Sequence, residues 1–431
     1  MTSADVARTG TVDWRSAQMQ ARIRKRYAKE RRFRFLGLGA LVFAAGFLLF
    51  LLTTIVSDGI GGFQRAEVPL DIEYSATTLG LDPAQMSGDG ADYAINRADF
   101  RSLVNAAAEA QLGTSEMISE GAWLDVRDRL RGDPSLLGSR ERVWVVAAPE
   151  VDLLAKGQIS FDVPAQRRAV SQEMINQYVV LNDRGDVQLS LNTGFLTKAD
   201  STSSELAGIW GALLGSLLTM AITLALSFPI GVMTAVYLEE YAPRNRFTDM
   251  IEVSINNLAA VPSIIFGLLG LSVFLNTFGM PRSAPVVGGV TLALMTLPVI
   301  VIASRVSLQS VPPSIRDAAL GIGASRLQVI LHHILPVALP GILTGTIIGL
   351  SRALGETAPL LLIGMRAFVS DVPGGVTDPA TALPVQIFLW SDEVGRGFVE
   401  KTSAAIMVLL AVLLSMNGVA IYLRNKFERR W

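Results

Sequence analysis

Six long apolar stretches separated by polar segments set the pattern of this chain. The first is an unbroken run from Phe35 to Val56, long enough as a helix to cross about 30 Å of hydrocarbon. Five more follow, at Leu206–Tyr237, Ile251–Leu275, Pro285–Ala303, Ala338–Ile363 and Ser403–Leu423. The pattern therefore predicts an all-α polytopic membrane protein with six transmembrane helices.

A polar segment of ordinary domain size, residues 61–205, separates the first apolar stretch from the others. Alternating or apolar runs predict strands, and periodic runs predict helices. The elements expected inside it are strands at Val143–Val146 and Val187–Leu191 and helices at Asp99–Ala110 and Gln166–Tyr178. Residues Asp183–Asp186, between two apolar stretches, predict a hairpin turn. We interpret the segment as an inserted α+β domain.

Charge is distributed unevenly and predicts the orientation of the chain in the membrane. Residues 1–60 hold 10 Lys/Arg against 4 Asp/Glu, residues 61–205 hold 13 against 22, and residues 206–431 hold 14 against 12. A cleaved signal peptide has a shorter apolar core than Phe35–Val56, so we interpret that run as a retained anchor. The positive-inside rule then places the basic N-terminus, the C-terminus and the loop before the fifth span in the cytoplasm.

These observations predict four parts. They are a basic cytoplasmic tail (1–34), a first transmembrane helix (35–60), an extracytoplasmic insertion (61–205) and a transmembrane core (206–431) with a cytoplasmic loop at 306–337.

Composition argues against several kinds of chemistry. Charged residues make up 17% of the chain, below the roughly 25% of soluble domains, and cysteine is absent. The only histidines are His332 and His333. Neighbours on a helix point about 100° apart, so the two would not share one metal. Because the chain has no Gly-Lys dipeptide, it has no Walker A loop for a nucleotide. We expect no catalytic residue, no metal and no cofactor, and an energy source in another subunit.

The loop at 306–337 carries signals for two short helices. Pro312–Pro313 ends one helix and allows another to begin, with Ser314 and Asp317 in the pattern of a capping box. Glycines interrupt this helix, and a second one follows until Pro336 and Pro340 reset the chain direction. The cues predict two short helices at an angle with small residues at the bend. On these cues alone, an ordinary cytoplasmic helical hairpin is an equal alternative.

Two opposite charges stand inside the fifth apolar stretch. An ionised side chain at mid-membrane costs several kcal/mol unless it is paired or faces water, so Arg352 and Glu356, four residues apart, are candidates for function. A guanidinium matches a tetrahedral oxyanion, which predicts an anion pathway here. The alternative is an ion pair that fixes helix register. Gly349 and Gly355 are expected to let another helix approach closely. Arg305 is either a second cation on the pathway or an interfacial residue.

The loop resembles the EAA coupling loop of ABC-importer permeases. The positions that fall at the spacings of that family are Asp317, Ala318, Ala319, Gly323, Leu335 and Pro336. Aspartate replaces the usual glutamate, and His333 stands at a usually aliphatic position. The resemblance implies six transmembrane helices of the type I, EAA-loop permease type, with the bend of the loop docked into a groove of an ATPase subunit.

Residues 352–364 narrow the resemblance to the PstA family of phosphate-importer permeases. Ala358–Pro359 favours that family over the related PstC permeases, and the resemblance covers roughly residues 205–431. It implies an ATP-driven importer of inorganic phosphate in the bacterial cytoplasmic membrane, in which Arg352 and Glu356 bear on phosphate passage. The partners implied are a PstC-like permease in a heterodimer, a PstB-like ATPase dimer, a PstS-like phosphate-binding protein, inorganic phosphate and the lipid bilayer, without nucleic acid.

Three other readings stay open at this point. A permease for sulfate or molybdate has the same sequence features. A secondary transporter usually shows an internal repeat and helices broken at mid-membrane, and neither is evident in the sequence. A membrane sensor with residues 61–205 as its receptor domain would not need the coupling loop.

Overall fold

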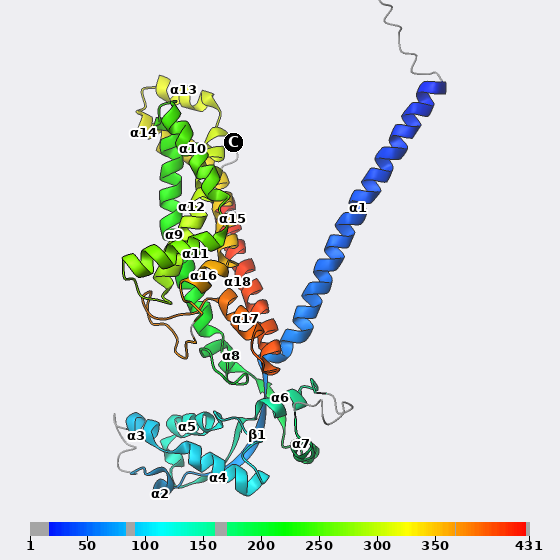
Figure 1. The fold of residues 1–431 in the computed structure, drawn as a ribbon, viewed down its shortest axis with the longest axis vertical. Coiled ribbons are helices and arrows are strands. Elements are labelled where there is room, and N and C mark those ends of the chain that lie inside the picture. Colours follow the sequence, from blue (N-terminus) through cyan, green and yellow to red (C-terminus); the bar gives the residue numbers. More distant parts are fainter. Residues whose placement is uncertain (1–16, 83–90, 160–169, 367, 428–431) are drawn as a thin grey trace, which may run out of the picture. The chain divides into compact units, whose positions relative to one another are not determined.

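The computed structural model describes residues 17–82, 91–159, 170–366 and 368–427 (Figure 1). They fall into two units, residues 1–57 and 58–431, which we describe separately. The described residues of the first unit all belong to the long helix α1 (Ala17–Gly59), whose last two residues fall in the second unit and whose apolar part contains the predicted first span. The second unit begins at the end of α1 with a 3-10 turn, η1 (Ile60–Phe63).

An antiparallel sheet with the strand order β2-β1-β3 forms the centre of the α+β domain. Its strands are β1 (Gln64–Glu73), β2 (Arg140–Val146) and β3 (Gln188–Leu191). The first predicted strand lies within β2, and the second, Val187–Leu191, begins one residue before β3. The central strand β1 is absent from the predicted elements, although its alternate residues Ala66, Val68, Leu70 and Ile72 are all fully buried. This period of two is the signal of a strand with one face toward a core.

Two helices of the domain match the predictions closely. Helix α4 (Phe100–Leu112) has its N-cap at Asp99, whose carboxylate accepts the Ser102 N–H, and α7 (Gln172–Arg184) contains residues 172–178 of the second predicted helix and continues beyond its predicted end. Residues 166–169 of that prediction lie outside the described residues. The other helices of the domain are α2 (Ala76–Leu79), α3 (Ala91–Arg97), α5 (Ala122–Gly132), η3 (Pro134–Leu136), α6 (Pro149–Ala155) and α8 (Thr193–Thr197).

The predicted hairpin turn at Asp183–Asp186 is wrong. Gly185 has a φ of +75° and ends α7, because its N–H bonds to the Asn182 carbonyl and the Asp186 N–H bonds to the Leu181 carbonyl. These bonds close a helix C-terminus, so the segment leads from a helix into β3.

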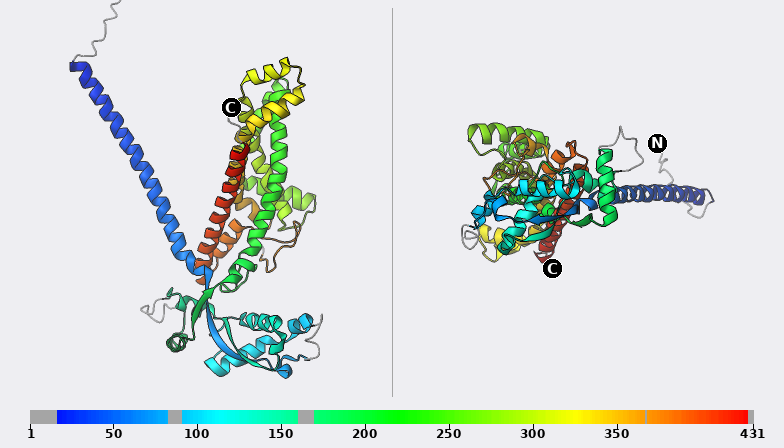
Figure 2. Two further views of the ribbon diagram at one scale, coloured as in Figure 1. Left: turned by 180° about the vertical axis from the view of Figure 1, so that it is seen from behind. Right: turned by 90° about the horizontal axis from the view of Figure 1, so that it is seen from below.

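In the rest of the second unit, three long helices pack side by side (Figure 2). They are α9 (Trp210–Val236), α12 (Pro285–Gln309) and α15 (Leu335–Leu354). The chain also contains α10 (Arg246–Ala259), α11 (Ser263–Leu269), α13 (Pro313–Gly321), α14 (Arg326–Val329), α16 (Ala358–Leu362), α17 (Leu383–Ser391), α18 (Gly397–Phe427) and three π-helical stretches, η5 (Tyr237–Tyr241), η6 (Gly270–Thr277) and η7 (Ile330–Ile334). Among the described residues, five helices are long and apolar enough to cross a membrane, or six if one bent pair counts as one span.

The bent pair corrects the third predicted span. The apolar stretch Ile251–Leu275 is divided between α10 and α11–η6, which meet at an angle of 101°. Pro262 stands at the break and serves as the N-cap of α11. A proline disfavours helical conformation in the residue before it, which ends α10 there. A helix broken in this way was not evident in the sequence.

The fifth predicted span, Ala338–Ile363, is also corrected at both ends. One helix runs from Arg326 through η7 to Leu354, so Pro336 and Pro340 do not redirect the chain. Pro336 lies in the first turn of α15, directly after the π-helical stretch, and Pro340 is carried inside the helix. At Gly355 the helix ends, and the remainder of the apolar stretch forms the short α16.

Close packing of α12 and α15 occurs at glycines other than those expected. A Cβ atom on Gly345 would lie 2.1 Å from the Ala303 Cβ, and one on Gly341 would lie 2.4 Å from the Ser307 Oγ. At Gly349 the nearest atom, on Val299, would be 3.8 Å away, which is ordinary contact. Gly345 is therefore the position where α15 depends on the absence of a side chain.

We expect Gly345→Leu to lower the yield of folded protein severely. The larger side chain forces α12 and α15 apart, and overpacking of this kind costs about 1–3 kcal/mol or more. The measurement is the amount of monodisperse protein after detergent extraction and size-exclusion chromatography. Gly349→Ala is the matched control and should keep the normal yield. Equal yields for both variants would contradict the packing described here.

Candidate functional site

The bend of the predicted coupling loop is a helix terminus closed by Gly323. The N–H of Gly323 bonds to the Leu320 carbonyl at 3.0 Å, and the N–H of Ala324 bonds to the Ala319 carbonyl at 3.1 Å. This pair of bonds is the Schellman arrangement, which requires a left-handed residue between them. Gly323 supplies it with a φ of +89°. Only glycine adopts this conformation without strain.

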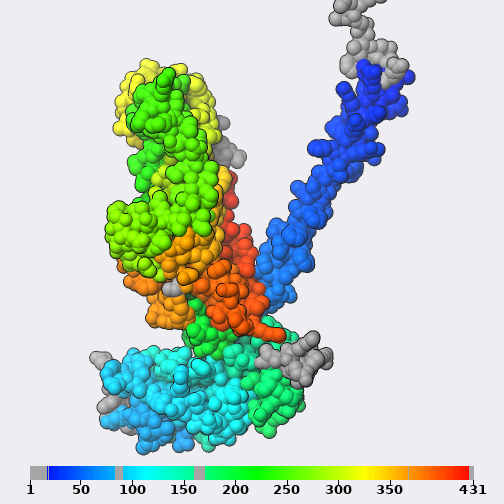
Figure 3. Space-filling view, in the orientation of Figure 1, coloured from blue at the N-terminus to red at the C-terminus, as the bar shows by residue number. Residues whose placement is uncertain are grey.

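The loop has one buried and one exposed face. Ala319 packs in an apolar cluster with Val311, Val329 and Ile334. Ala318 and Asp317 are exposed, and Ile322 at the bend is 83% exposed. Figure 3 shows the loop (yellow) at one end of the helices, partly behind green residues in this view.

Ion pairs hold the loop and the adjacent helix ends together. The Arg316 Nη2 lies 2.5 Å from the Glu240 Oε1, and the Arg305 Nη2 lies 2.6 Å from the Glu252 Oε1. The Arg305 Nε is also 3.7 Å from Glu239. These glutamates were not among the predicted site residues: Glu239 and Glu240 follow the second apolar stretch, and Glu252 lies at the start of the third.

Local capping differs from the expectation at one of the two short helices. The N-cap of α13 is Pro312, without a side-chain bond, so Ser314 lies inside the first turn and the predicted capping box with Asp317 is wrong. A capping box does open α14, where Ser325 and Gln328 bond reciprocally. The next residues, including the exposed His332 and His333, belong to the π-helical stretch η7 before Leu335–Pro336.

The predicted charged pair lies where α15 ends. Arg352 is in the last turn of α15 and its Nε lies 3.4 Å from the Glu356 Oε1, beyond the helix end at Gly355. The Arg352 side chain is 54% exposed, so more than half of its surface is accessible beside the Glu356 carboxylate. Its neighbour Ser351 donates a hydrogen bond of 2.6 Å to the Asn417 Oδ1 on α18. The site thus has one open guanidinium with a carboxylate beside it.

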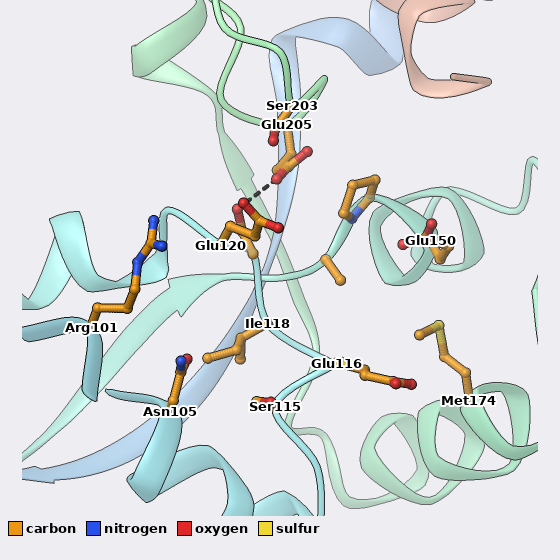
Figure 4. A pocket seen from close by; sticks show the side chains of 13 residues that line it. Arg101, Asn105, Ser115, Glu116, Ile118, Glu120, Glu150, Met174, Ser203 and Glu205 are labelled. Atoms are coloured by element: carbon orange, nitrogen blue, oxygen red, sulfur yellow. Dashed lines mark hydrogen bonds between the residues drawn. The ribbon is translucent and has the colours of Figure 1, made fainter. Parts of the chain in front are cut away.

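A cavity of about 570 Å³ on the α+β domain offers a different chemistry (Figure 4). Glu116, Glu120 and Glu150 line it, and Arg101 is the basic residue of its lining. Glu205, which accepts a 2.5 Å hydrogen bond from the Ser119 Oγ, is nearly fully buried, and burial raises the pKa of its carboxyl group. The excess of carboxylates opposes an anionic ligand in this cavity.

Comparison with known proteins decides which family the chain belongs to. Residues 227–430 match the family described as "Binding-protein-dependent transport system inner membrane component", and residues 20–165 match a domain of unknown function. The phosphate transport system permease protein PstA of Haemophilus influenzae is 32% identical over 242 residues, which are 56% of this chain and 83% of that protein. This chain belongs to the PstA family.

Two other relatives and one solved structure are also similar to this chain. The phosphate transport system permease protein PstA 1 of Mycobacterium tuberculosis is 34% identical over 226 residues, 52% of this chain and 72% of that protein. The probable ABC transporter permease protein YqgI of Bacillus subtilis is 36% identical over 223 residues, 49% of this chain and 74% of that protein. A solved structure, the MetNI methionine ABC transporter in an inward-facing conformation, is 19% identical and covers 51% of this chain and 98% of that chain with a TM-score of 0.42.

Membership of the PstA family gives the fold its general description. The chain is a largely helical, multi-pass inner-membrane permease with several candidate spans. Both the loop at Gly323 and the pair at Arg352 lie within the matched residues 227–430. The α+β sheet lies outside them.

Proposed function

We propose that this chain is the permease subunit of an ATP-driven importer of inorganic phosphate. It would form half of the translocation pathway and couple to a cytosolic ATPase. The observation that carries the proposal is the match to permeases named for phosphate transport, at 32% and 34% identity over 56% and 52% of this chain. The chain acts as a permease and not as an enzyme, because ATP hydrolysis belongs to the partner subunit.

The proposed topology has six spans, with the bent pair α10–α11 counted as one and both termini in the cytoplasm. Two contacts support opposite locations for the α+β domain and the coupling loop. Directly before the start of α9, the Ile209 N–H donates a hydrogen bond to the Phe195 carbonyl of α8 in the α+β domain. At the other end of the same helix, Glu240 forms an ion pair with Arg316 of the loop. Residues 210–241 make a helix roughly 48 Å long, more than the thickness of a hydrocarbon core. The α+β domain, residues 61–205, is then extracytoplasmic and the loop at 306–337 cytoplasmic.

The loop residues take separate roles in the proposed coupling to the ATPase. Asp317 and Ala318 stand on the exposed face that would meet the ATPase, and Ala319 holds this face to the helices beneath it. Gly323 fixes the bend. Leu335–Pro336, directly after η7, begin the helix that leads from the loop to Arg352.

Arg352 is the proposed contact for phosphate in the pathway. Its exposed guanidinium can donate to a tetrahedral oxyanion, while Glu356 orients it and weakens binding enough to allow release. Arg305 was the second candidate cation. Its two glutamate partners favour the interfacial alternative, in which it ties α12 to α10 and η5.

The proposed assembly contains two different permease subunits. This chain would pair with a PstC-like permease, two copies of a PstB-like ATPase and a PstS-like phosphate-binding protein on the outer face. A chain named PstC from Haemophilus influenzae is 31% identical over 228 residues, which supports a related second subunit.

Uptake of radiolabelled phosphate tests the proposal directly. Cells that lack this chain should lose high-affinity uptake, and expression of the chain from a plasmid should restore it. Excess unlabelled phosphate should compete, whereas sulfate and molybdate should not. Competition by sulfate or molybdate at equal concentration would instead assign the permease to that oxyanion, and unchanged uptake in the deletion strain would overturn the proposal.

A further inference from the structure

A cluster of charged side chains is buried where the α+β domain meets the first turn of α18. The Lys156 Nζ lies 2.7 Å from the Asp152 Oδ2 and 2.9 Å from the Glu400 Oε1. The side chains of Lys156 and Glu400 are only 4% and 3% exposed. Charges removed from water this completely need each other, because loss of one partner leaves the other uncompensated.

Further hydrogen bonds connect the cluster to segments far apart in the sequence. The Asp152 Oδ1 accepts the Ala66 N–H of β1 at 2.7 Å, and the Gln158 Nε2 donates to the Glu400 Oε2 at 2.8 Å. The Lys401 Nζ donates to the Gly62 carbonyl at 3.1 Å and lies 5.0 Å from the centre of the Phe195 ring. The sheet, η1, α6, α8 and α18 therefore meet at one point.

The backbone of η1 packs directly against α18. A Cβ atom on Gly61 would lie 2.5 Å from the Glu400 Oε1, and one on Gly62 would lie 2.7 Å from the Ala404 Cβ. Phe195 of α8, Trp390 of α17 and Phe398 of α18 share an apolar cluster beside this contact. A junction that combines an apolar core with buried charges resembles the interior of a domain more than a flexible linker.

The same helix reaches the proposed pathway. From Glu400, α18 continues without interruption to Asn417, roughly 25 Å further along, where the Asn417 Oδ1 accepts the hydrogen bond from Ser351. Ser351 immediately precedes Arg352. A rotation of the α+β domain that carried α18 with it would act on this hydrogen bond.

We propose that Asp152, Lys156 and Glu400 form a latch that joins the α+β domain and α18 into one rigid body. A protein that binds the domain would then act on α18, and through Asn417 on the position of Arg352. The predicted effect on phosphate transport rests on the proposed function, but the rigid connection between the α+β domain and α18 does not. The two can therefore be tested separately.

The test measures distances between spin labels in the full transporter complex. The chain has no cysteine, so labels can be placed without removing native residues. One pair, at Glu109 of α4 and Leu414 of α18, reports on the latch. A second pair, at Glu109 and Glu173 of α7, reports on the domain alone. All three positions are exposed.

In the protein with the unchanged latch, the distribution of distances between the labels at Glu109 and Leu414 should be single and narrow. In Glu400→Leu this distribution should become broad or split. The Glu109–Glu173 distance should stay the same. Arg142→Met is the matched control, because it removes the more exposed 2.6 Å ion pair with Asp186 inside the domain, and it should leave the Glu109–Leu414 distance narrow.

A narrow Glu109–Leu414 distance in Glu400→Leu would overturn the latch, whatever the variant does to phosphate uptake. If Glu400→Leu also alters the Glu109–Glu173 distance, the domain has unfolded, and the isosteric Glu400→Gln is judged by the same two distances. That variant keeps the size of the side chain and removes the negative charge that pairs with Lys156. It should broaden the Glu109–Leu414 distance alone, and an unchanged distance would again overturn the proposal.

Discussion

Gly323→Val is expected to abolish phosphate uptake while the chain still inserts into the membrane. Gly323 has a φ of +89°, where a β-branched residue is strained by about 1–3 kcal/mol. The substitution breaks the pair of hydrogen bonds that closes α13 and displaces the exposed bend around Ile322. The bend is the proposed contact with the ATPase, so coupling fails. Uptake of radiolabelled phosphate and copurification of the ATPase subunit measure the two effects.

Gly321→Ala is the control for this variant. Gly321 lies two residues away in the same loop, without a positive φ, and a Cβ atom there meets no neighbour within 4 Å. Its uptake should stay close to the level of the unchanged protein. Normal uptake in Gly323→Val, at equal amounts of membrane-inserted protein, would contradict the role of the loop.

The elements that sequence analysis found are those with local signals. The strands β2 and β3 and helix α4 have short periodic patterns with clear boundaries, and the bend at Gly323 follows from a glycine placed after a short helix. The bend of 101° in the third span has a local cause in Pro262, but an apolar stretch of sufficient length predicts a straight helix. Its angle depends on packing against α12 and α16, which no local pattern contains.

The charged contacts were predictable in part, for a similar reason. Arg352 and Glu356 are four residues apart, so their pairing follows from helix geometry, although the helix ends between them. Arg305 and Lys156 have partners far away in the sequence, at Glu252 and Glu400. A sequence shows that a charge is present, whereas its partner becomes known only from the fold.

Arg352→Ala is expected to reduce phosphate uptake to background without loss of the assembled transporter. The variant removes the open guanidinium and leaves the Glu356 carboxylate, which is 20% exposed, without its partner. Attraction of the anion is lost and repulsion is added at the same place. Arg352→Lys should recover only part of the uptake, because an ammonium lacks the planar pair of donors that fits a tetrahedral oxyanion. The measurement is the initial rate of uptake at equal amounts of purified complex.

The double variant Arg352→Ala/Glu356→Gln separates the two effects. Uptake that rises above that of Arg352→Ala would show that the unpaired carboxylate repels phosphate, and uptake that stays at background would show that attraction by Arg352 is indispensable. Arg396→Ala, which removes an exposed arginine just before α18, is the matched control and should transport normally. Unchanged uptake in Arg352→Ala would exclude this residue from the pathway. In that case the 3.4 Å contact with Glu356 is an ion pair that fixes the end of α15, which is the alternative the sequence left open.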